Sequence, residues 1–108
     1  MLVVALDHDG DELAELAGAS AEQQRLSPTF KPVFLVATAD TRVLGDLGFA
    51  FEAFLPHEDW ERLSLAGTYE DYRRGRVRAA ERLYRPDTVI HVAPGASVEL
   101  TSPPGDEP

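Results

Sequence analysis

Short apolar runs recur along the chain and predict the strands of a buried sheet. Residues 2–6 and 33–37 are continuous apolar runs, which is the pattern of strands covered on both faces. Residues 49–55, closed by Pro56, are rich in aromatic side chains, and residues 88–92 are rich in β-branched ones. The pattern therefore predicts four short strands.

In the first two segments between these runs, apolar residues recur at helical spacing. We expect a helix over residues 11–26, in which Asp9 and Glu12 form a capping box at the start. The inner stripe of that helix is expected to consist of Leu13, Leu16, Ala17 and Ala21. A short helix follows the second strand, capped by Thr38 or Asp40, and Gly48 stands where a C-terminal cap glycine belongs.

The segment before the fourth strand predicts one short and one long helix. One or two helical turns are expected over residues 58–63, where Trp60 is expected to pack with Phe54 and Leu63. The long helix covers residues 68–84, begins at a box of Thr68 and Asp71, and ends before Pro86. The spacing assigns its inner face to Tyr69, Tyr72, Arg76, Val77, Ala80 and Leu83.

Strands that alternate with helices imply right-handed parallel crossovers. We therefore expect an α/β, three-layer Rossmann-like domain over residues 1–102, with a parallel sheet in the order 3-2-1-4 and a disordered acidic tail over residues 103–108. The expected core residues are Val4, Leu6, Val33, Leu35, Val36, Phe51, Val89 and Val92. Ligands of such sheets bind where the strand order reverses, here between residues 7–10 and residues 93–96, which include Gly95.

Composition narrows the possible functions. The 108 residues carry a formal charge of −9, which disfavours nucleic acid and anionic membranes as partners. There is no cysteine, so disulfides, thiol nucleophiles and thiolate metal sites are excluded. The sequence shows no apolar run of membrane-spanning length and no secretion signal, and we expect a cytoplasmic protein without membrane insertion.

The densest polar cluster follows the first strand and comprises Asp7, His8, Asp9, Gly10, Asp11 and Glu12. Alternate aspartates could bind Mg²⁺ through their oxygen atoms, with Asp7 and Asp9 as ligands. The other interpretation is that Asp9 and Glu12 only cap a helix. The sequence leaves both open. Of the other histidines, His57 is expected at the surface and His91 in the core.

An apolar strand that leads into Asp7-His8-Asp9-Gly10 resembles the first motif of haloacid-dehalogenase-type phosphotransferases. The resemblance implies that Asp7 is the nucleophile, that Asp9 is the acid/base, and that Thr38 binds the phosphate. Mg²⁺ would then be the cofactor; otherwise we expect none. Lys31 precedes the second strand, whereas the family places its lysine after the third.

Residues 30–92 resemble the N-terminal half of GT-B-type glycosyltransferases. The similar segments are residues 30–36, residues 47–56, which include a glycine before the third strand and end in Leu-Pro, and residues 84–90, which contain Arg-Pro-Asp-Thr-Val. The resemblance implies a sugar or nucleotide-sugar ligand and makes His8 the general base, with Asp7 or Asp9 orienting it. The family binds its sugar nucleotide mainly in a second Rossmann domain, which implies that this domain needs a partner.

Six of the ten cationic side chains lie within residues 73–85. Because arginine and tyrosine are enriched at interface hot spots, Arg73 and Arg76 are expected to bind an acidic partner or a second copy. The alternative is a solvated helix whose tyrosines pack inward. We expect the domain to serve recognition or assembly, in glycan biosynthesis, rather than stand-alone catalysis. The alternative function is a phosphotransferase that uses Asp7 and Asp9.

Overall fold

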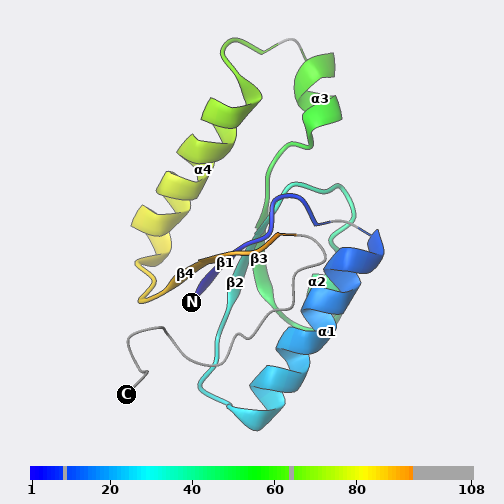
Figure 1. The fold of residues 1–108 in the computed structure, drawn as a ribbon, viewed down its shortest axis with the longest axis vertical. Coiled ribbons are helices and arrows are strands. Elements are labelled where there is room, and N and C mark those ends of the chain that lie inside the picture. The colour runs from blue at the N-terminus through cyan, green and yellow to red at the C-terminus, as the bar shows by residue number, and fades with distance from the viewer. Residues whose placement is uncertain (9, 64, 94–108) are drawn as a thin grey trace.

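The computed structural model describes residues 1–8, 10–63 and 65–93, along which strands and helices alternate (Figure 1). In chain order the elements are β1 (Leu2–Val4), α1 (Gly10–Leu26), β2 (Val33–Val36), α2 (Arg42–Asp46), β3 (Ala50–Ala53), α3 (His57–Arg62), α4 (Tyr69–Tyr84) and β4 (Val89–His91). Each lies on a segment for which the sequence pattern predicted it. The predicted tail over residues 103–108 lies outside the described residues.

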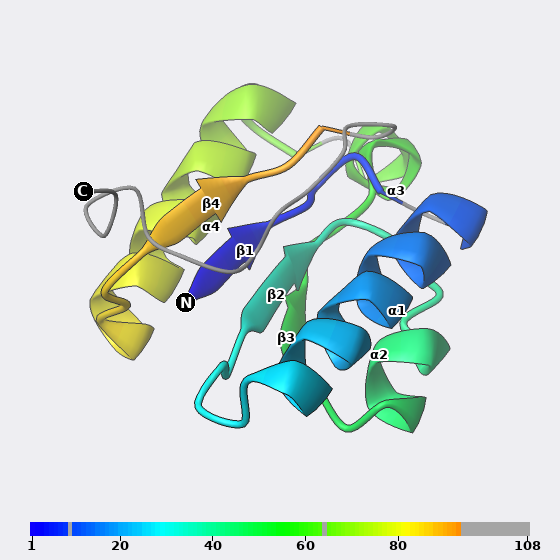
Figure 2. The same cartoon turned by 60° about the horizontal axis from the view of Figure 1, so that its bottom comes forward.

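The four strands form one parallel sheet in the order β3-β2-β1-β4. In the central strand, Val3 pairs with Phe34 of β2 and with Ile90 of β4. The chain steps from β1 outward to β3 and then reverses direction to reach β4. Right-handed crossovers in opposite directions place their helices on opposite faces, so α1 and α2 cover one face and α4 covers the other (Figure 2). The predicted α/β class, parallel sheet and strand order are confirmed.

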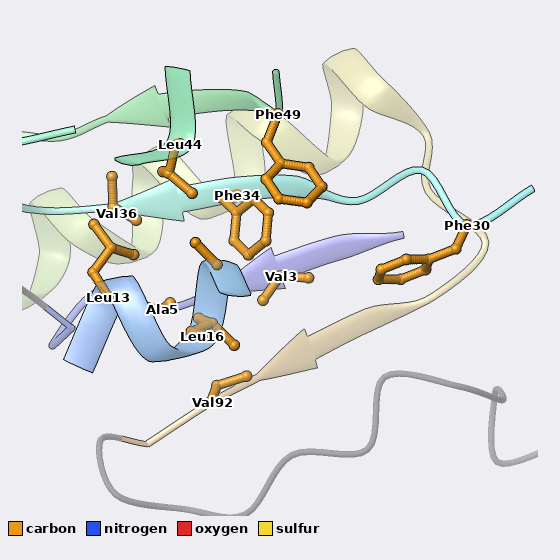
Figure 3. Packing of buried hydrophobic residues seen from close by; sticks show 11 residues of the cluster. Val3, Ala5, Leu13, Leu16, Phe30, Phe34, Val36, Leu44, Phe49 and Val92 are labelled. Carbon is orange, nitrogen blue, oxygen red and sulfur yellow. The ribbon is translucent and has the colours of Figure 1, made fainter. Parts of the chain in front are cut away.

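Alternate side chains of the strands build a separate core on each face of the sheet. Val3, Phe34 and Val36 point toward α1 and α2, where they pack with Leu13, Leu16 and Leu44 (Figure 3). The rings of Phe34 and Phe49 meet edge to face, with their centroids 5.2 Å apart. On the opposite face, Leu2, Val4 and Leu35 pack with Phe54, Val77 and Ala80. Period-two alternation thus distributes the apolar runs between two layers of helices.

The predicted core was correct for the centre of the sheet, but it also included residues at the periphery that are only half-buried. Val4, Leu35, Val36 and Val92 are buried. Leu6, Val33, Phe51 and Val89 are only half-buried. The last two lie on β3 and β4, which are the edge strands of the sheet. An edge strand has a neighbour on one side only, so its side chains keep more contact with solvent.

The ends of α2 show one correct and one wrong prediction. Gly48 has a φ of +78°, and its N–H donates to the carbonyl of Gly45 at 3.0 Å while that of Phe49 donates to Leu44 at 2.9 Å. These two bonds form a Schellman motif, as the glycine predicted. At the other end the N-cap is Thr41, without a side-chain cap, rather than Thr38 or Asp40. Asp40 instead binds the backbone N–H and guanidinium of Arg42.

Helix α4 begins as predicted, because the Thr68 hydroxyl accepts a hydrogen bond from the Asp71 N–H at 3.1 Å. Its inner face differs from the prediction. Val77 and Ala80 are buried, whereas Leu83 is 68% exposed and Arg76 is also exposed. The helix extends past the edge of the core, so the apolar spacing at its C-terminal end does not lead to burial. Among the described residues, no helix has the length and apolar character needed to cross a membrane.

Candidate functional site

The carboxyl ends of β1, β2 and β3 open into one pocket of about 510 Å³, which we call the edge pocket. Its lining residues are Leu6, Asp7, His8, Ala37, Pro56, His57, Glu58, Tyr69 and Arg73. The first three follow β1, Ala37 follows β2, and Pro56 follows β3, whereas Tyr69 and Arg73 come from the first turns of α4. Parallel strands bring their carboxyl ends to one edge, and this explains why these distant segments meet.

An ion pair between Asp7 and Arg73 crosses this edge. The Arg73 Nη2 atom lies 3.1 Å from the Asp7 Oδ1 atom, and the guanidinium carbon lies 5.5 Å from the centre of the Tyr69 ring. The Arg73 side chain is only 23% exposed, whereas that of Asp7 is 66% exposed. Arg73 is therefore held by a carboxylate and an aromatic face together, and the Asp7 carboxylate remains accessible to a ligand.

His8 lies beneath the edge pocket and is 4% exposed. Its backbone N–H donates to the carbonyl of Ala5 at 3.2 Å, which turns the chain directly after β1. Its Nδ1 atom is buried and has no hydrogen-bond partner among the described residues. A buried polar nitrogen without a partner is unusual, because leaving it unsatisfied costs about 1–3 kcal/mol. Among the described residues, His8 thus carries the one buried side-chain polar atom without a hydrogen-bond partner.

Two tyrosines fix the wall of the edge pocket. The Tyr69 hydroxyl donates to the carbonyl of Leu55 at 2.7 Å, and the Tyr72 hydroxyl accepts from the Leu55 N–H at 2.9 Å. Burial is the main cause that raises the pKa of Tyr69, so its hydroxyl remains a donor at neutral pH. The ring of Trp60 lies 4.9 Å from that of Tyr72. These contacts hold the end of β3 against α4.

This aromatic cluster corrects the expected packing of Trp60 and shows how two tyrosines of α4 are oriented. Trp60 packs on Tyr72 and Tyr69, whereas Leu63, its expected neighbour, is 52% exposed. Tyr69 and Tyr72 turn inward, as the solvated-helix interpretation of α4 requires. Neither tyrosine is therefore available as an exposed anchor for a protein partner.

Of the crevice expected between residues 7–10 and 93–96, Asp7 and Ala93 line a common groove, whereas residues 9 and 94–96 lie outside the described residues. A groove of about 260 Å³ lies between the ends of β1 and β4, where it is lined by Asp7, Arg73, His91 and Ala93 among others. His91 is exposed, so its predicted place in the core is wrong, because β4 is an edge strand. The Asp7–Arg73 pair lines both this groove and the edge pocket.

The remaining predicted site residues are dispersed. The Thr38 hydroxyl accepts from the Asp40 N–H at 3.3 Å and is not part of the edge pocket. Gly10, whose φ of +49° favours glycine, begins α1 and lines a different groove. The Arg76 guanidinium lies 5.2 Å from the centre of the Phe54 ring. Asp9 and Gly95 lie outside the described residues.

The predicted metal site lies partly outside the described residues. Among residues 1–8, 10–63 and 65–93, no group of three His, Asp or Glu side chains is placed to hold a metal ion. The Mg²⁺ site stays a prediction, because it includes Asp9.

Sequence reasoning missed His57, Glu58 and Tyr69 as pocket residues. His57 and Glu58 directly follow the third strand, so the rule for carboxyl edges could have found them.

Comparison of the chain with protein-family models, with curated proteins and with solved structures finds no match.

Proposed function

We propose that this chain is a recognition domain that binds a hydroxyl-rich ligand, a sugar or a nucleotide sugar, in the edge pocket. The observation that carries the proposal is the convergence of Asp7, His8, Tyr69 and Arg73 on one pocket of about 510 Å³ at the carboxyl edge of a parallel sheet. Such edges are where ligands of open α/β sheets bind.

The chemistry of the pocket favours the hydroxyl groups of a sugar as the groups that it contacts. Asp7 and Glu58 supply carboxylate acceptors, and His8 and His57 supply imidazole nitrogens. The one guanidinium of the described pocket, that of Arg73, is already paired with Asp7. Since carboxylates accept hydrogen bonds from hydroxyls and imidazoles serve as donors or acceptors, a sugar ring satisfies both kinds of group.

The sequence resemblance to the N-terminal half of GT-B-type glycosyltransferases supports a sugar as the ligand class. In those enzymes a second Rossmann domain binds most of the sugar nucleotide. The described residues form one four-stranded sheet, and under this proposal we equate it with one such half. We therefore assign recognition to these residues and leave the transfer step to a partner domain. The resemblance also supports a role in glycan biosynthesis.

Calorimetric titration with glucose, UDP and UDP-glucose tests this proposal. We expect binding of glucose or UDP-glucose, and we expect Glu58→Gln and His8→Gln each to weaken it at least tenfold. The matched control is Glu22→Gln, because Glu22 is an exposed carboxylate on α1, outside the edge pocket. Absence of heat with all three probes contradicts the proposal, and so does an equal loss in the control variant.

The phosphotransferase alternative is favoured by one observation. Asp7 follows β1 at the carboxyl edge and keeps an accessible carboxylate, as a nucleophile for phosphoryl transfer requires. Under this alternative, Mg²⁺ raises the melting temperature, and Asp7→Asn removes both that increase and any phosphatase activity. If calorimetry detects no Mg²⁺ binding at millimolar concentration, the alternative is excluded.

A further inference from the structure

Exposed arginines outnumber exposed carboxylates on α4, whereas exposed carboxylates outnumber cations on α1. Helix α4 and its cap carry a stripe of three exposed arginines, Arg78, Arg82 and Arg85, which we call the basic stripe. Arg78 and Arg82 are spaced by four residues and therefore lie along one side of the helix, and Arg85 is the cap residue that directly follows it. Glu81 is the one acidic residue among residues 78–85.

The basic stripe differs from the other arginines of α4 in having no fixed partner. Arg73 pairs with Asp7 and Arg74 pairs with Asp71, while Arg76 lies over the Phe54 ring. In the part of the chain that the structure describes, no ion pair involves the basic stripe. Its guanidinium groups therefore keep their capacity to bind carboxylates from another molecule.

The opposite face carries a groove of complementary charge. Between α1 and α2 lies a hollow of about 410 Å³ lined by Asp11, Asp40, Asp46 and Arg42 together with Gly10, Leu13, Ala14 and Val43, which we call the acidic groove. Asp40 binds Arg42 at 2.9 Å, and this hydrogen-bonded pair lowers the pKa of Asp40 to about 2. The two remaining carboxylates, of Asp11 and Asp46, give the groove its net negative charge.

We propose that two copies of this chain associate head to tail, with the basic stripe of one copy in the acidic groove of the next. A second copy is the partner that fits, because one chain carries both complementary surfaces. The net charge of −9 repels copies in other orientations, so that charge complementarity selects this one.

The geometry also determines the type of assembly. Figure 2 shows α4 on one side of the sheet and α1 with α2 on the other. The basic stripe, which α4 and its cap carry, and the acidic groove, which residues of α1 and α2 line, therefore lie on opposite faces. A two-fold dimer would need both surfaces on one side of the molecule in order to form both contacts. The association is therefore heterologous, and each added copy leaves one surface of each kind free for the next.

Charge reversal with complementation tests this proposal by sedimentation equilibrium. One variant, Asp11→Lys with Asp46→Lys, reverses the groove, and the other, Arg78→Glu with Arg82→Glu, reverses the stripe. We expect the wild-type chain to self-associate and each variant alone to associate at least tenfold more weakly. A mixture of the two variants should associate again, because the reversed groove of one then faces the reversed stripe of the other.

The matched control for the stripe variant is Arg25→Glu with Lys31→Glu, which makes the same change in net charge at exposed positions outside both surfaces. It should associate like the wild type. Circular dichroism of each variant establishes that it is folded. A wild-type chain that remains monomeric, a variant that associates like the wild type, or a mixture that remains monomeric overturns the proposal.

Discussion

The Arg73 guanidinium lies 3.1 Å from the Asp7 carboxylate and so joins the second turn of α4 to the loop after β1. Arg73 is far from Asp7 in sequence, and its neighbours on α4 include four further arginines. The pair shows which arginine of that helix is part of the candidate site. It also supplies the boundary between the edge pocket and the groove beside β4.

Removing either partner of this ion pair should lower the free energy of unfolding modestly. The loss should be larger for the arginine than for the aspartate. Asp7→Asn is expected to lower the free energy of unfolding by about 0.5 kcal/mol, because the Asp7 side chain is largely solvated. Arg73→Ala is expected to cost more, about 1–2 kcal/mol, because it also removes the contact with the Tyr69 ring. Urea unfolding of the two variants measures this difference, and equal losses contradict it.

Tyr72→Phe should destabilise the domain through a single backbone group. The change leaves the Leu55 N–H without its acceptor at 2.9 Å, and we expect a loss of about 1–2 kcal/mol in the free energy of unfolding. Tyr84→Phe is the control, because Tyr84 is 39% exposed at the end of α4 and should tolerate the change. Chemical denaturation of both variants tests the prediction. It is wrong if the two have the same stability.

Two glycines of one short segment should respond to alanine with opposite signs. Gly48 has a φ of +78°, so Gly48→Ala is expected to cost about 1 kcal/mol through backbone strain, although the space around it is open. Gly45 lies within α2 in equally open space and without a positive φ, and Gly45→Ala should stabilise by about 0.5–1 kcal/mol. Melting temperatures that shift in the same direction contradict this.

The raised pKa of Tyr69 predicts how stability depends on pH in the alkaline range. Because burial favours the neutral phenol, the folded-state pKa exceeds the ordinary value of 10.0. The corresponding stability is fully present below pH 10 and is lost as the pH rises through the folded-state pKa. Ultraviolet titration should show one tyrosine that ionises late, and Tyr69→Phe should remove that component. If the variant titrates like the wild type, the assignment is wrong.

Local chemistry in the sequence was enough to predict most of the fold. Gly48 and Thr68 mark helix ends through interactions within a few residues, and apolar runs between helical segments determine a parallel sheet. Only part of the candidate site was predicted. Asp7 and His8 could be predicted because they directly follow a strand. The bonds of Tyr69 and Tyr72 to Leu55 depend on how α4 sits on the sheet, which no local pattern encodes.

Some wrong predictions share a physical cause. Leu83 follows the apolar spacing of α4, yet the helix extends past the core it covers, so its last turn faces solvent. Arg76 follows the same spacing but stays exposed, with its guanidinium over the Phe54 ring. His91 occupies a strand, yet that strand is at the edge of the sheet. Periodicity describes which residues share a face of an element, whereas burial depends on how far the neighbouring element extends.

Nuclear magnetic resonance mapping of the ligand tests the central claim, recognition in the edge pocket, most directly. On titration of the labelled chain with UDP-glucose and with glucose, we predict amide shift changes concentrated at Asp7, His8, Ala37, His57 and Tyr69. Residues of the opposite layer, such as Glu22 and Arg25, should not change. A spectrum that is unaltered at millimolar ligand, or changes confined to residues outside the edge pocket, would contradict the proposed function.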